Sequence, residues 1–134
     1  MIGFDVNWWA ILVATLINMV IGTLWYSPVL FGKPWMKLVG RKMEDMGNPN
    51  VAYSITTVSA LVQTFILANI VRDMSITSPL QGALLGLLVW LAFAAATTIS
   101  DTLFANRPWK LWVLNTGYYL AVLIINGALL AVWR

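Results

Sequence analysis

Four long stretches without a charged residue constrain this chain more than any other feature. They cover residues 6–32, 46–71, 74–100 and 111–133, and together they hold 103 of the 134 residues. A helix needs about 20 mainly apolar residues to cross a hydrocarbon core of roughly 30 Å, so each stretch can cross once. Inside such a core the backbone polar groups must be satisfied locally, which favours helices. The pattern predicts an all-α fold, a four-span transmembrane helical bundle.

Prolines and clustered charges indicate where each span begins and ends. Pro28 favours a helix end just before it, and Pro79 fits the first turn of a helix. Arg72 and Asp73 interrupt the apolar sequence between the second and third spans. We therefore predict one membrane domain over residues 1–134. Its spans are expected at about 8–27, 51–71, 80–105 and 109–133.

The longest connection, residues 28–50, also has a pattern. The aromatic side chains of Phe31 and Trp35 alternate with the basic side chains of Lys33 and Lys37. This alternation is typical of a short amphipathic helix that lies in the headgroup layer. We predict a short amphipathic interfacial segment after the first span.

Basic residues are distributed unevenly between the two ends of the predicted bundle. Six Lys and Arg residues follow the first span or lie between the third and fourth spans, whereas Arg72 and Arg134 lie at the opposite end. Cytoplasmic loops carry an excess of Lys and Arg. We therefore expect both termini on the outside of the membrane. The first apolar stretch has no preceding Lys or Arg and is longer than a typical signal sequence, so we expect it to be retained.

The composition excludes several classes of chemistry. The chain has no cysteine and no histidine, which rules out disulfides, thiolate nucleophiles, a Ser-His-Asp triad and the usual zinc and haem sites. Four of its five acidic residues lie outside the predicted spans. We therefore expect no catalytic residue, no metal and no cofactor. Anionic lipid headgroups explain the net charge of +3 more simply than nucleic acid does.

Asp101 is the acidic residue that lies within a predicted span. A carboxylate there needs a partner, and it is either a proton or cation site or one half of a structural ion pair with Arg107. The turn between the last two spans brings further polar groups to a similar depth. We predict a polar cluster near the cytoplasmic face, with the Asp101 carboxylate facing the bundle interior. Its expected members are Asp101, Arg107, Asn115, Thr98 and Tyr26.

Amide side chains and small residues recur within the spans. Asn18 and Gln63 fall near the middle of the first two spans, and Asn126 lies in the fourth, which predicts an intramembrane polar seam. The seam either holds the helices together or lines a permeation path. Trp90 lies deep in the third span, and Gln63 is a candidate acceptor for its indole N–H. Small residues that let helix backbones approach closely are expected at the packing contacts, namely Ala14, Gly22, Gly82 and Gly86.

Several short strings resemble a known family. Leu24-Trp25-Tyr26-Ser27-Pro28 and Phe31-Gly32-Lys33 are followed by Trp90-Leu91-Ala92-Phe93 and by Asn115-x-Gly117-Tyr118. Over nearly the whole chain, these strings resemble the small bacterial membrane proteins known as domain of unknown function 1761. The chain departs from the family at Tyr119, where a histidine is expected in many members. The resemblance implies a multi-pass protein of the bacterial inner (plasma) membrane, with no assigned activity.

The sequence leaves two classes of function open. The first is a non-enzymatic accessory or scaffold subunit, or a homo-oligomer, because small-residue rows and aromatic belts suit packing against other helices. The alternative is a small homo-oligomeric transporter or channel that uses the polar seam and Asp101. A membrane enzyme is the weakest hypothesis. The expected partners are the lipid bilayer and further copies or other membrane-protein subunits, and no nucleic acid.

Overall fold

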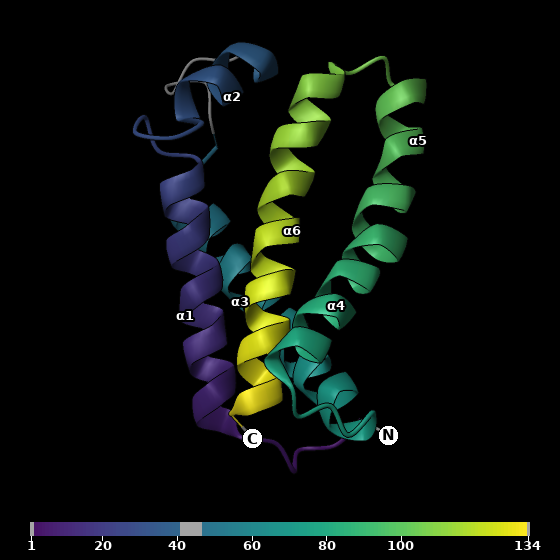
Figure 1. Cartoon of the computed structure of the whole chain (residues 1–134). Coiled ribbons are helices and arrows are strands. Elements are labelled where there is room, and N and C mark those ends of the chain that lie inside the picture. Colours follow the sequence, from purple (N-terminus) through teal and green to yellow (C-terminus); the bar gives the residue numbers. More distant parts are fainter. Residues whose placement is uncertain (1, 41–46, 134) are drawn as a thin grey trace.

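The computed structural model describes residues 2–40 and 47–133. In chain order its elements are α1 (Trp8–Trp25), α2 (Gly32–Val39), α3 (Pro49–Asp73), α4 (Pro79–Trp90), η2 (Leu91–Ala95), α5 (Ala96–Phe104) and α6 (Trp109–Val132). The elements α4, η2 and α5 follow one another without a break and form one long span (Figure 1). With α1, α3 and α6, this span gives four helices in the described residues that are long and apolar enough to cross a membrane. The predicted all-α, four-span bundle with a short helix after its first span is confirmed.

The local sequence explains where the helices begin. The side chain of Asn7 accepts a hydrogen bond from the backbone N–H of Trp9 at 3.1 Å, and so caps α1. Asn48 caps α3 in the same way, accepting from the N–H of Asn50 at 2.9 Å. Pro79 occupies the first turn of α4, where a backbone N–H has no partner within the helix. Each of these spans therefore begins at a residue suited to a helix start.

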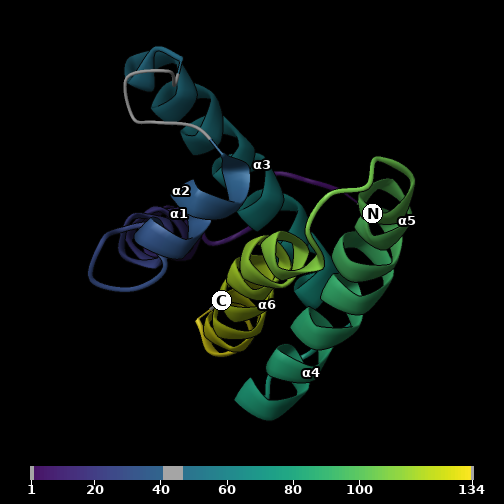
Figure 2. The same cartoon turned by 90° about the horizontal axis from the view of Figure 1, so that it is seen from above.

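The tightest contact in the bundle joins α4 to α6, and two glycines make it possible. A Cβ atom added to Gly82 would overlap the backbone carbonyl of Gly127, and one added to Gly86 would overlap that of Leu123. Both glycines are buried. Because they carry no side chain, the two helix backbones touch directly. α1 and α3 also contact α6, which therefore lies at the centre of the bundle (Figure 2).

The two ends of the bundle differ in their basic residues. α1 begins and α6 ends at one end, together with the α3–α4 connection that follows Arg72, whereas α2 and the α5–α6 turn lie at the other end (Figure 1). The end formed by α2 and the turn carries Lys33, Lys37, Arg107 and Lys110. Arg41, Lys42 and Arg134, which entered the orientation argument, lie outside the described residues.

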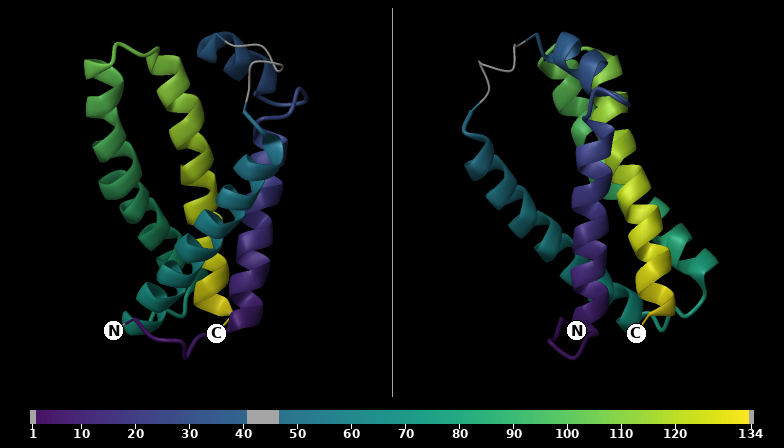
Figure 3. Two further views of the ribbon diagram at one scale, coloured as in Figure 1. Left: turned by 180° about the vertical axis from the view of Figure 1, so that it is seen from behind. Right: turned by 90° about the vertical axis from the view of Figure 1, so that its left-hand side faces the viewer.

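Helix α3 leaves the bundle as it approaches the α2 end. In its second half, Ala60, Thr64 and Leu67 are buried. In its first half, every residue from 50 to 59 is exposed. The side view shows this first half diverging from α1 and α6 (Figure 3, right). The spans are therefore close together at the end where α1 begins and spread apart at the opposite end.

A π-helical turn, η2, lies where the third span separates from α6. The backbone N–H of Ala96 bonds to the carbonyl of Leu91, five residues earlier, whereas an α-helix uses a spacing of four. On one side of this turn α4 packs closely on α6, and on the other side α5 makes far fewer contacts with it. Such turns occur frequently at functional sites.

Candidate functional site

Three polar side chains from three helices meet at the middle of the bundle. The hydroxyl of Tyr118 in α6 donates to Oδ1 of Asn18 in α1, and Nδ2 of Asn18 donates to Oε1 of Gln63 in α3 at 3.0 Å. Asn18 and Tyr118 are buried. Hydrogen bonds between helices satisfy such groups where water is absent. We call Asn18, Gln63 and Tyr118 the polar triad, and it links α1, α3 and α6.

Neighbouring residues fit around the polar triad. One turn from Asn18, the hydroxyls of Thr15 and Thr64 share a hydrogen bond of 2.9 Å between α1 and α3. On the other side, a Cβ atom added to Gly22 would lie 3.1 Å from the hydroxyl oxygen of Tyr118. Gly22 therefore leaves room for the phenol ring of Tyr118 where α1 meets α6.

Asn126, the third amide of the predicted seam, bonds to the backbone of α1. Its Nδ2 donates to the carbonyl oxygen of Ala14 at 3.2 Å, and both residues are buried. Its Oδ1 is buried without a hydrogen-bond partner in the part of the chain that the structure describes. The structure thus joins Asn18 to Gln63 and leaves Asn126 outside the polar triad.

The expectation that Asp101 faces the bundle interior is wrong. Its carboxylate pairs with Arg107 at 3.0 Å, but the Asp101 side chain is 63% exposed and that of Arg107 is 59% exposed. The reason is the position of Asp101 near the end of α5, where this helix has moved away from α6 and the partner comes from the exposed turn. Such an exposed pair contributes little to stability.

The other expected members of the Asp101 cluster lie in two separate contacts. Tyr26 donates to Oδ1 of Asn115 at 2.8 Å, and so joins the end of α1 to α6. Thr98 of α5 accepts from the indole N–H of Trp112 at 2.8 Å. The five residues therefore lie in three separate contacts, one of them completed by Trp112, rather than in one site.

A pocket of about 330 Å³ lies beside the polar triad, between α3, the α4–α5 span and α6. Its walls are mainly apolar, and its polar lining comes from Gln63, Thr98 and Tyr119. Oε1 of Gln63 is occupied by Asn18. Among the described residues, Nε2 of Gln63 and the hydroxyl of Tyr119 have no hydrogen-bond partner. The pocket therefore combines apolar walls with two hydrogen-bond donors that no described residue uses.

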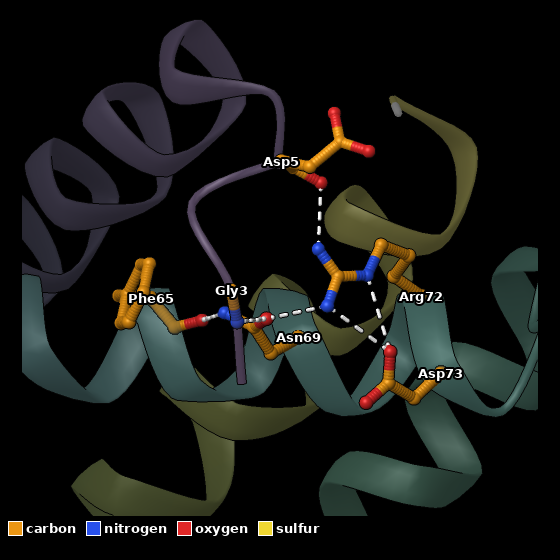
Figure 4. A network of polar contacts seen from close by, with 6 residues as sticks. All are labelled: Gly3, Asp5, Phe65, Asn69, Arg72 and Asp73. Carbon is orange, nitrogen blue, oxygen red and sulfur yellow. Dashed lines mark hydrogen bonds and ion pairs between the residues drawn. The ribbon is translucent and has the colours of Figure 1, made fainter. Parts of the chain in front are cut away.

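A further network, which no sequence pattern predicted, lies at the end where α1 begins. Oδ1 of the buried Asn69 accepts from the backbone N–H of Gly3 and from the guanidinium of Arg72, both at 2.8 Å. Arg72 also donates to the carbonyl oxygen of Asp5 at 2.7 Å and pairs with Asp73 at 3.1 Å (Figure 4). These contacts fasten the segment before α1 to the end of α3. The spacing of three residues between Asn69 and Arg72 signals a contact on a helix, but the backbone partners leave no trace in the sequence.

Comparison with known proteins identifies one family. The family model described as Protein of unknown function (DUF1761) matches residues 9–131, nearly the whole chain. This match confirms the resemblance found in the short strings of the sequence. No curated protein and no solved structure matches the chain.

Proposed function

The chain belongs to the DUF1761 family of proteins of unknown function, and we propose that it is a non-enzymatic membrane protein that binds another transmembrane helix along the first half of α3. The partner is a second copy or another membrane subunit, so the protein acts as an accessory or scaffold subunit. One observation carries the proposal. Thr56 and Ser59 are exposed on successive turns of α3, and neither hydroxyl has a hydrogen-bond partner within residues 2–40 and 47–133.

The neighbouring hydroxyls of α3 differ because they bond within the helix. Ser54 donates to the carbonyl oxygen of Asn50 at 2.8 Å, and Thr57 donates to that of Tyr53 at 2.7 Å. A hydroxyl left without a partner in an apolar environment costs about 1–3 kcal/mol. A second helix can supply the missing acceptor for the hydroxyl of Thr56.

The position of these hydroxyls also suits a helix contact. Thr56, Ala60 and Thr64 follow one another at steps of four residues, which places them on one face of α3. Ala60 and Thr64 are buried within the bundle. The same face continues past the point where α3 diverges, and there Thr56 is exposed. Contacts between membrane helices are enriched in such small and hydroxyl-bearing residues.

The non-enzymatic part of the proposal rests on side-chain chemistry. The chain has no histidine and no cysteine, which are common general bases and nucleophiles. Within the polar triad, Asn18 and Tyr118 are engaged with one another. These groups are suited to holding helices together.

Photo-crosslinking tests the proposed helix contact. A photoreactive phenylalanine analogue is placed at Thr56, at Ser59, or at Leu16 as a control, because Leu16 is 61% exposed on α1. Irradiation of intact membranes should give adducts with a polypeptide from Thr56 and Ser59, and lipid adducts from Leu16. The mass of the adduct identifies the partner as a second copy or another subunit. Lipid adducts alone at all three positions would overturn the proposal.

The competing proposal is a small homo-oligomeric transporter or channel. Gln63 and Tyr119 favour it, because both face a pocket at mid-membrane depth with an available donor. In that case Asp101 binds the proton or cation at its exposed position, where it pairs with Arg107. Proton or cation flux into vesicles that contain the purified protein, abolished by Asp101→Asn, would support transport. Absence of flux with the unmodified protein would contradict transport and favour the accessory role.

A further inference from the structure

We propose that the pocket beside the polar triad binds a membrane-dissolved carbonyl compound of the quinone class. The pocket lies between the second half of α3, η2 and α6. It is therefore separate from the exposed first half of α3, to which the proposed helix contact belongs. A ligand in this pocket does not require that contact.

The available hydrogen-bonding groups determine the chemistry of the ligand. Because Asn18 occupies Oε1 of Gln63, the Gln63 amide offers its Nε2 donor to the pocket. The hydroxyl of Tyr119, which has no partner in the described part of the chain, offers a second donor. Donors in an apolar pocket favour a ligand with acceptors, and a quinone carries two carbonyl oxygens and no donor of its own.

The depth of the two donors favours a molecule dissolved in the hydrocarbon core over a bilayer phospholipid. Tyr119 lies ten residues after Trp109, the first residue of α6, or about 15 Å along the helix. That distance is half of a hydrocarbon core of roughly 30 Å. The ester carbonyls of phospholipids lie at the edge of this core, whereas a quinone ring can reach its centre.

The size and walls of the pocket suit such a ring and the first part of its tail. The volume of about 330 Å³ falls within the roughly 300–1,000 Å³ that is typical of small-molecule pockets. Ile66, Phe93 and Leu123 provide apolar walls. Phe93 comes from the π-helical turn η2, so the irregular part of the third span contributes directly to the pocket.

Binding of decylubiquinone to the purified protein in lipid nanodiscs tests the inference. The quinone retained by protein-containing nanodiscs is compared with that retained by empty ones. Tyr119→Phe should weaken binding about three- to tenfold, because it removes one hydrogen bond to the ligand. The fold should persist, since this hydroxyl bonds to no described residue. Tyr53→Phe, on the exposed part of α3, is the matched control and should leave binding unchanged.

A second pair of variants tests the location. Ala94→Phe fills the pocket and should weaken binding at least about tenfold, whereas Ala92→Phe, at an exposed position of the same turn, should not. Equal retention by protein-containing and empty nanodiscs would overturn the inference. So would full competition by decylbenzene, which has the alkyl tail without carbonyl oxygens, because it would identify the pocket as a groove for lipid chains. Neither outcome affects the crosslinking test at Thr56.

Discussion

Two buried polar residues of α6 differ in how completely their hydrogen bonds are formed. Tyr118 donates to both the side chain and the backbone carbonyl oxygen of Asn18. Asn126 donates to Ala14 at 3.2 Å, and its Oδ1 has no partner in the described residues. Breaking a completed bond costs free energy, whereas removing an unsatisfied buried group recovers a desolvation cost. We therefore predict that apolar substitutions at the two positions change the free energy of unfolding differently.

Tyr118→Phe should lower the free energy of unfolding by about 0.6 to 1.7 kcal/mol, which are the average and the largest values for hydrogen bonds between membrane helices. Asn126→Leu should leave it unchanged or raise it, because leucine has a similar size and removes the unsatisfied oxygen. Unfolding in mixed micelles with increasing dodecyl sulfate measures both effects. An equal loss in the two variants would contradict this explanation.

Individual contacts could be predicted only where both partners were polar side chains at matching depth. Asn18 and Gln63 were expected in one seam and do bond to each other. Trp90 was assigned Gln63 as its candidate acceptor, but its indole N–H donates to the carbonyl oxygen of Thr116 at 2.7 Å. Every residue carries a backbone carbonyl, so no residue type in the sequence signals such an acceptor.

At the scale of elements, the charge-free stretches predicted the four long apolar helices that the described residues contain, because the cost of burying charge in lipid acts on every turn of a helix. The π-helical turn η2 and the divergence of α3 were not predicted. Both depend on how one helix packs on another, which hydropathy does not record. The small residues Gly82 and Gly86 indicated a contact but not its partner, which is the backbone of α6.

Gly86→Leu should separate α4 from α6 and lower the free energy of unfolding by about 1–3 kcal/mol. The added side chain meets the rigid backbone of Leu123 rather than a movable side chain. Ala96→Leu, at an exposed position of the same span, serves as the control. Thermal unfolding in detergent measures both variants. Equal stability of the two would show that the α4–α6 contact tolerates a side chain.

At the scale of the whole molecule, the ends of the bundle differ in charge, and we propose that the end with α2 and the α5–α6 turn faces the cytoplasm of a bacterial inner membrane. A reporter fused after Arg134, or inserted at Ser75, should then report the outside. One inserted at Gly40 should report the cytoplasm. A cytoplasmic signal from the fusion after Arg134 would reverse this orientation.

The spans spread apart at the α2 end, and this leaves exposed the hydroxyls of Thr56 and Ser59 on which the proposed function rests. The most direct measurement is native mass spectrometry of the protein extracted from its own membrane in lipid nanodiscs. We predict an assembly that contains a second copy or another subunit. The double substitution of Thr56→Val and Ser59→Ala should reduce it to the single chain, because the hydroxyls that the partner satisfies are removed. A single chain with lipid alone, found already for the unmodified protein, would contradict the proposed helix contact.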